Sequence, residues 1–189
     1  MTRSWDKLKK EVSVCQQCGL YKTRTKVVFG EGGFEKKVVL IGEAPGKNED
    51  LQGRPFVGSA GRVLDKMLGL AGLSRNDVFI TNVVKCRPPH NRDPLPEEIE
   101  SCFPFLRRQL FLIKPKLVIT LGRFALSRFS SGLISQVHGV PKRVKWRFKN
   151  KEISFILFPV FHPAVALYLS LIHISEPTRP LYISYAVFC

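Results

Sequence analysis

Apolar positions along the chain follow two spacings. Short apolar runs predict buried strands at residues 37–42, 78–84 and 117–121. Helix-forming segments, mostly with apolar residues every three or four positions, predict helices at residues 5–14, 59–70, 96–113 and 123–129. A hairpin is expected from residues 144–148 and 153–160, with its turn at Asn150 and Lys151. Because strands alternate with helices, we expect an α/β domain with a mostly parallel sheet.

Polar loops rich in glycine and proline follow two of the predicted strands. They span residues 43–58 and 87–96. In open parallel sheets, ligands bind at the carboxyl ends of the strands. The loops after Gly42, Val84 and Val160 are therefore expected to converge on one site.

The charge of the chain indicates a polyanionic partner. Among 189 residues, thirty Lys and Arg oppose fifteen Asp and Glu, which gives a net charge of +15 and a pI near 9.9. Lys and Arg release counterions from a phosphate backbone, so nucleic acid is the leading partner, and the alternative is a basic protein without one. No apolar run approaches about 18 residues, and no apolar stretch follows the basic N-terminus, so neither a membrane span nor a secretory signal is predicted. We expect a monomer in the cytoplasm, associated with the nucleoid when it is on DNA.

Four cysteines are candidates for metal binding. Cys15 and Cys18 form a C-x2-C pair, Cys86 begins a loop, and Cys102 lies early in a predicted helix. A chain without a secretion signal rarely carries a disulfide framework, so metal binding gains weight. Four thiolates satisfy either a tetrahedral zinc ion or a [4Fe–4S] cluster, and spacing alone does not separate the two. In the alternative interpretation, Cys86 and Cys102 are ordinary buried cysteines.

The last 21 residues of the chain differ in character from the rest. Residues 169–189 resemble translated DNA adapter from a sequencing library. We expect a non-native tail there, which sets aside Cys189 and His173. Residues 1–168 then form one domain that is incomplete at its C-terminus. The alternative is a genuine C-terminal strand.

Several residues at the predicted strand ends are candidates for chemistry. The turn Gly42-Glu-Ala-Pro-Gly46 allows a backbone to approach a ligand closely, but it lacks the Lys of a P-loop. Phe56 lies in a polar loop, where a ring either stacks on a base or fills a gap in the core. Asn82 offers a donor and an acceptor from a strand, where asparagine is disfavoured. His162 suits an oxygen that gains negative charge, although a histidine at a strand end is more often structural.

Three stretches in this order resemble one family. GEAPGKNEDLQGRPFVGSAG, TNVVKCRPPHNRDPLPEE and FHPA, together with the four cysteines, are similar to the family 4 (iron–sulfur) uracil-DNA glycosylases over about residues 5–168. The resemblance implies a three-layer α/β/α fold with a central, mostly parallel four-stranded sheet. It also implies hydrolysis of the N-glycosidic bond of flipped-out deoxyuridine in DNA. That reaction leaves an abasic site and initiates base excision repair.

The resemblance also implies residue roles. Cys15, Cys18, Cys86 and Cys102 would ligate a [4Fe–4S] cluster. Phe56 would stack on the flipped uracil, Asn82 would bind its N3 and O4 edge, and His162 would hydrogen-bond O2 as the bond breaks. Asn91 would position the base or a water molecule. The remaining expected site residues belong to the first motif: Glu43, Ala44, Gly46 and Glu49.

Ala44 stands where the best-known branch of the superfamily has a water-activating Asp, so no strong base is assigned. Three alternatives stay open. They are a glycosylase that also removes other deaminated bases, a non-catalytic iron–sulfur or zinc module that binds DNA, and a nucleotide-binding regulator. The absence of a P-loop Lys and of a Rossmann pattern counts against the last.

Overall fold

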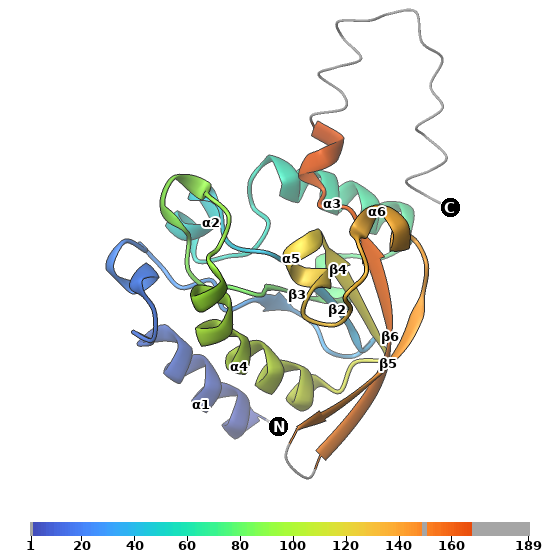
Figure 1. The fold of residues 1–189 in the computed structure, drawn as a ribbon, viewed down its shortest axis with the longest axis horizontal. Helices are drawn as coiled ribbons and strands as arrows, with labels where there is room; N and C mark the ends of the chain where they lie inside the picture. Colours follow the sequence, from blue (N-terminus) through green and yellow to red (C-terminus); the bar gives the residue numbers. More distant parts are fainter. Residues whose placement is uncertain (1, 149–150, 168–189) are drawn as a thin grey trace, which may run out of the picture.

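A computed structural model describes residues 2–148 and 151–167 of the chain, which form a six-stranded sheet covered by helices (Figure 1). The order of the strands is β1-β3-β2-β4-β6-β5. Their bounds are Glu31–Gly32 (β1), Val38–Gly42 (β2), Phe79–Asn82 (β3), Leu117–Leu121 (β4), Lys142–Phe148 (β5) and Lys151–Val160 (β6). The central strands β3, β2, β4 and β6 are parallel to one another, as expected, and the edge strands β1 and β5 are antiparallel to their neighbours.

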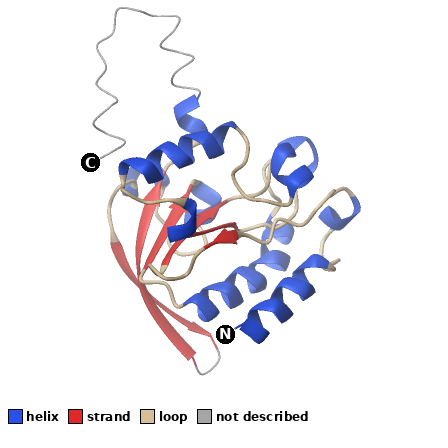
Figure 2. Cartoon of the chain, turned by 180° about the vertical axis from the view of Figure 1, so that it is seen from behind, coloured by secondary structure: helices blue, strands red, loops and turns tan. Residues whose placement is uncertain are grey.

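Helices lie on both faces of the sheet (Figure 2). Their bounds are Thr2–Ser13 (α1), Lys47–Gln52 (α2), Ser59–Leu70 (α3), Pro96–Ile113 (α4), Arg123–Leu126 (α5) and Ile134–Val137 (α6). Short 3-10 helices span Gly19–Lys22, Arg75–Asp77 and Pro89–Asn91. Within the described part of the chain, no helix has the length and apolar character that a membrane crossing requires.

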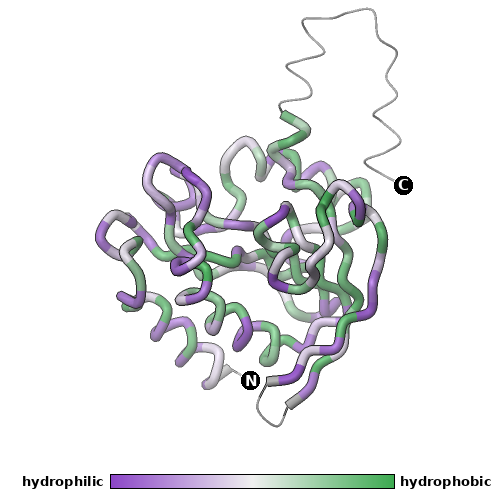
Figure 3. Tube along the Cα trace, in the orientation of Figure 1, coloured by the Kyte–Doolittle hydropathy of each residue, from purple (hydrophilic) through white to green (hydrophobic). Residues whose placement is uncertain are grey.

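Alternation along β2 divides the core into two layers. Val39 and Ile41 belong to one apolar cluster with Leu106 and Leu110 of α4, whereas Leu40 belongs to another with Leu64 of α3. Successive side chains on a strand point to opposite faces, so each face of the sheet is covered by a different helix. Helix α1 packs in turn against α4 through Leu8 and Val12. Apolar residues accordingly follow the central strands in Figure 3, and polar residues lie mainly on loops and outer helix faces.

The structure adds elements that the apolar pattern does not predict. The expected polar loop at 43–58 contains α2, which starts after Gly46 and carries Glu49 and Asp50 in its first turn. The helix ends at Gln52 and is capped by Gly53, which has φ 75°. The expected helix at 123–129 ends already at Leu126. The expected hairpin is formed by β5 and β6. Of the two residues expected in its turn, Lys151 begins β6 and pairs with Phe148, whereas Asn150 and the tail at 169–189 lie outside the described residues.

Candidate active site

A cavity of about 330 Å³ lies beyond the carboxyl ends of the parallel strands. The loops after β2, β3 and β6 converge on it, as the strand order requires. Every residue that the sequence places in the active site contributes to its wall. The lining consists of Glu43, Ala44, Pro45, Gly46, Glu49, Phe56, Ala60, Asn82, Pro88, Asn91, Arg92, Asp93, Pro94, His162 and Ala164.

Asn82 ends strand β3 at the floor of this cavity. Its Cα is in register with Gly42 of β2, and its side chain is only 2 % exposed. Within the described part of the chain, its buried Oδ1 has no hydrogen-bond donor. A buried acceptor left unpaired costs about 1–3 kcal/mol. A ligand N–H in the cavity would therefore find an acceptor already in place.

Phe56 forms the neighbouring wall from a strained turn. Its φ is 52°, its side chain is 5 % exposed, and its ring stacks on that of His162 with 5.7 Å between centroids. Glu49 Oε1 accepts hydrogen bonds of 2.8 Å from the backbone N–H groups of Val57 and Gly58. These contacts hold the ring in a backbone conformation that a phenylalanine rarely adopts.

Arg75 supports the same turn from the other side. Its guanidinium donates to the carbonyl oxygens of Pro55, at 3.0 Å, and of Phe56. Glu31 and Asp65 in turn accept hydrogen bonds from Arg75. This role could not be predicted from the sequence, because Arg75 lies nearly 20 residues after the turn and belongs to no motif.

His162 and Glu43 are half-buried in the wall. His162 Nδ1 accepts the N–H of Ala164 at 3.2 Å, so Nε2 carries the proton of the neutral ring. Burial lowers the pKa of His162, which favours that neutral form. Glu43 Oε1 accepts the N–H of Phe124 at 3.0 Å, and burial raises the pKa of its carboxyl group. Both shifts favour uncharged side chains.

Asn91 lies on the exposed rim of the cavity. His90 and Asn91 both have left-handed backbone conformations, with φ of 54° and 56°, and Arg87 Nε donates to Asn91 Oδ1 at 2.7 Å. The loop is anchored where Arg92 forms an ion pair with Glu98 at 2.6 Å. The anchoring arginines were not predicted from the sequence.

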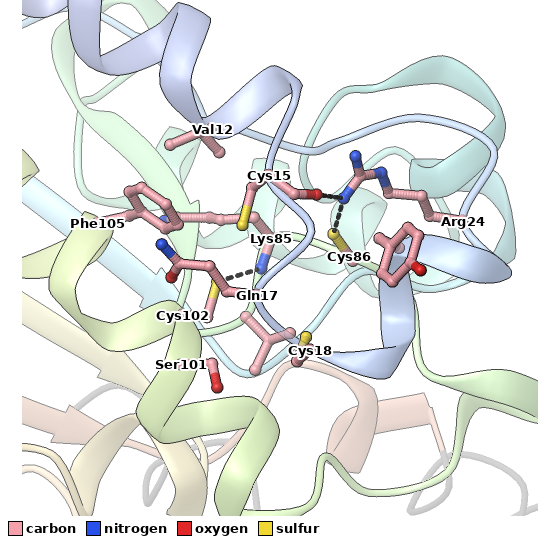
Figure 4. Close-up of a pocket in the computed structure, with 12 residues that line it drawn as sticks. Val12, Cys15, Gln17, Cys18, Arg24, Lys85, Cys86, Ser101, Cys102 and Phe105 are labelled. Carbon is pink, nitrogen blue, oxygen red and sulfur yellow. Dashed lines mark hydrogen bonds between the residues drawn. The ribbon is translucent and has the colours of Figure 1, made fainter.

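The four predicted cysteines line a second, smaller cavity (Figure 4). They come from the segment after α1, from the loop after β3 and from α4. Arg24 donates to Cys86 Sγ at 3.3 Å and to the carbonyl of Cys15 at 2.7 Å. Burial raises the pKa of the Cys18 and Cys86 thiols and that of Cys102 to about 12. All four are free cysteines.

Lys85 lines the cysteine cavity and contacts Asn82 of the larger cavity, and it was not predicted as a site residue. Its Nζ donates to Thr81 Oγ1, Asn82 O and Gln109 Oε1 at 2.6, 2.7 and 2.7 Å. Its backbone N–H donates to Cys102 Sγ at 3.2 Å. Burial lowers the pKa of its ammonium group to about 7. A lysine in a polar, proline-rich stretch would ordinarily be expected in solvent.

Comparison with known proteins gives one consistent result. The family model of the uracil DNA glycosylase superfamily matches residues 29–177. A type-4 uracil-DNA glycosylase of Sulfurisphaera tokodaii is 49 % identical, over 87 % of this chain and 76 % of the relative. Another from Archaeoglobus fulgidus is 47 % identical over 87 % and 84 % of the two chains. A third from Thermotoga maritima is 45 % identical over 82 % and 79 %.

Proposed function

The chain belongs to the type-4 uracil-DNA glycosylases, and on this premise we propose that it hydrolyses the N-glycosidic bond of deoxyuridine flipped out of DNA. The reaction leaves an abasic site and starts base excision repair. One observation carries the assignment to the 330 Å³ cavity: the buried Oδ1 of Asn82, which lines it, lacks a donor among the described residues. The N3–H of uracil supplies such a donor.

Base selection follows from the two ends of the Asn82 amide. Oδ1 accepts the N3–H of uracil, and Nδ2 donates to O4. Cytosine presents an amine in place of O4 and a bare N3, so it leaves polar groups unpaired on both sides. Stacking on Phe56 contributes roughly 1–3 kcal/mol. That offsets part of the cost of taking the base out of the helix, which is a few kcal/mol.

Cleavage of the bond leaves negative charge on uracil and positive charge on the sugar. The neutral His162 ring donates from Nε2 to O2, where the negative charge grows. Such a preset donor is worth roughly 3 kcal/mol, or about 10²-fold in rate. Glu43 and Asn91 hold water or the base at the cavity wall, and Ala44 and Gly46 leave room for the ring. Glu49 acts through the Phe56 turn that it holds.

The residues around the second cavity fit an iron–sulfur cluster. Four thiols from three separate segments face one cavity. Among residues 2–148 and 151–167, however, no group of three or more His, Cys, Asp or Glu side chains could hold a single metal ion. A [4Fe–4S] cluster is larger than one zinc ion, so its ligands lie farther apart. The free volume of about 20 Å³ has room for about one water molecule, so the thiols must separate to admit the cluster.

We propose that Cys15, Cys18, Cys86 and Cys102 ligate this [4Fe–4S] cluster. When bound, the cluster supplies a structural tie between the segment after α1, the loop after β3 and helix α4. The net charge of +15 supports DNA as the partner, and the family of the chain supports uracil in that DNA. We also propose that the enzyme acts as a monomer in the cytoplasm, on the nucleoid when bound. Residues 1–168 would form the glycosylase domain, with a non-native tail behind it.

An Asn82→Asp variant tests the assignment of the cavity. The carboxylate cannot donate to O4, so the variant should release uracil at least 10-fold more slowly or discriminate less between uracil and cytosine. The assay is single-turnover cleavage of a single-uracil oligonucleotide, read as alkali-labile sites. Asn76→Asp makes the same change at an exposed position and should behave as wild type.

Two results would contradict the proposal. Unchanged rate and selectivity in Asn82→Asp would remove Asn82 from the site. Tight DNA binding by the wild-type protein without release of any base would identify a non-catalytic DNA-binding module. A panel of oligonucleotides with hypoxanthine and xanthine distinguishes the broader glycosylase, which would release those bases as well.

A further inference from the structure

Lys85 is a buried cation whose hydrogen-bond acceptors are all uncharged. Its side chain is 1 % exposed, and Nζ donates only to a hydroxyl, a backbone carbonyl and an amide oxygen. Within the described part of the chain, it forms no ion pair with a carboxylate. Buried ammonium groups are normally paired with an anion, because burial removes the water that stabilises their charge. A negative charge near Lys85 would therefore keep its side chain in the charged form.

The contacts of Lys85 lead to one source of such a charge, the cysteine cavity. Lys85 itself contributes to the cavity wall, and its backbone N–H donates to Cys102 Sγ. In Figure 4 the dashed line between Lys85 and Cys102 marks this hydrogen bond. Thiols are neutral, but the thiolates that hold a metal centre are anionic. A bound iron–sulfur cluster would thus provide the missing counter-charge.

The other end of Lys85 reaches the backbone of Asn82, a residue that lines the 330 Å³ cavity. Strand β1 pairs with β3 only at Phe79 and Ile80, so the carbonyl group of Asn82 lies beyond that ladder. Lys85 Nζ is the donor to this carbonyl, at 2.7 Å. The same Nζ bonds Thr81 Oγ1 of β3 and Gln109 of α4, which fixes the strand end to the helix. The backbone of Asn82 is therefore held by the side chain of a residue that also lines the cysteine cavity.

We propose that Lys85 is a positioning residue that couples the cysteine cavity to Asn82, the residue that selects the base. The negative charge of the cluster and its thiolates holds the ammonium group in place. The ammonium group holds the Asn82 carbonyl, and the side-chain amide of Asn82 thereby keeps its alignment with uracil. This inference rests on the proposed function, from which it takes the roles of Asn82 and of the cluster.

A Lys85→Met variant tests the coupling at both ends. Methionine keeps an unbranched apolar stem but removes the charge and the donor. We expect the single-turnover rate on uracil to fall about 10-fold or more, because small displacements of aligned groups cost up to about 10²-fold. We also expect the reduction potential of the cluster to fall, because a nearby positive charge favours the more reduced, more negative state. Visible absorption gives the cluster content, to which the rates are normalised.

Gln109→Met is the matched control. It breaks the same buried network, since Gln109 accepts from Lys85 and donates to Phe29 O, but among the described residues its side chain forms no hydrogen bond with Asn82 or a cysteine. It should lower the melting temperature while the rate and the reduction potential stay near those of wild type. If Lys85→Met does not fold, the same comparison is made with Lys85→Gln, which keeps an N–H donor but has no charge.

The outcomes separate the two proposals. A Lys85 variant with wild-type rate and potential would overturn the coupling, as would equal changes in the Lys85 and Gln109 variants, which would show a merely structural role. If the wild-type protein releases no uracil, the proposed function fails, whereas the potential of Lys85→Met still tests the link to the cysteines.

Discussion

Gly42→Ala should disrupt the 330 Å³ cavity in which we propose that uracil binds, while leaving the fold in place. Gly42 is the last residue of β2, and a Cβ atom at this position would lie 2.6 Å from Phe56 Cζ and closer still to Asn82 Oδ1. Ordinary contacts of a Cβ atom begin at 3.4 Å. The ring and the amide must therefore retreat by about 1 Å, a displacement that costs on the order of 10²-fold in rate.

The assay is single-turnover release of uracil at saturating enzyme, with the melting temperature measured on the same preparations. Gly69→Ala is the control, because a Cβ there meets nothing within 4 Å. That substitution lies in α3 and should stabilise the protein by roughly 0.5–1 kcal/mol without affecting the rate. A wild-type rate for Gly42→Ala would refute the packing of Asn82 and Phe56 against Gly42 as the basis of base recognition.

Three further predictions follow from the site and the surface. His162→Ala should reduce the single-turnover rate at least 10-fold, and a wild-type rate would exclude its role at O2. The lowered pKa of His162 means that the folded protein binds fewer protons than the unfolded one just below pH 6.5. Stability should therefore decline as pH falls below about 6.5, and melting curves of His162→Asn should show less of that decline. Arg143 and Lys145 are exposed on β5, and replacing them with Gln should reduce the slope of the logarithm of the DNA-binding constant against the logarithm of salt concentration by about 1 for each lost phosphate contact. Gln at Lys9 and Lys10 of α1 is the control and should leave the slope unchanged. An unchanged slope in the β5 variant as well would place the DNA surface elsewhere.

Regular spacing explains which elements were predictable. Helix α4 and strand β4 have the expected bounds, because their apolar residues face a helix or a sheet along their whole length. Helix α2 has no such pattern: its one buried residue is Asp50, which accepts the N–H groups of Thr25 and Lys26. Strand β1 has two residues and exists only through pairing with β3. Elements held by long-range polar contacts leave no periodic signal in the sequence.

The residues of the candidate site likewise fall into those that could be predicted from the sequence and those that could not. The strand ends and the linked motifs were enough to predict that residues such as Asn82, Phe56 and His162 share one cavity. The residues that hold them, Arg75 and Lys85, could not be found this way. Each acts through backbone carbonyls, whose positions depend on the folded chain and not on a residue type at a fixed spacing.

These supporting contacts bear on how the enzyme can work without a strong base. Ala44 provides no carboxylate, and burial disfavours the charged forms of both Glu43 and His162. A departing uracil anion in such a cavity depends on hydrogen-bond donors that are aligned before the bond breaks, because little water remains to solvate it. The alignment is set by the backbone: Ala164 N–H orients the His162 ring, and the absence of a side chain at Gly42 leaves the space that Asn82 and Phe56 occupy. The rate of uracil release should accordingly be more sensitive to displacements of this backbone, and of the side chains that it aligns, than to the loss of any single carboxylate.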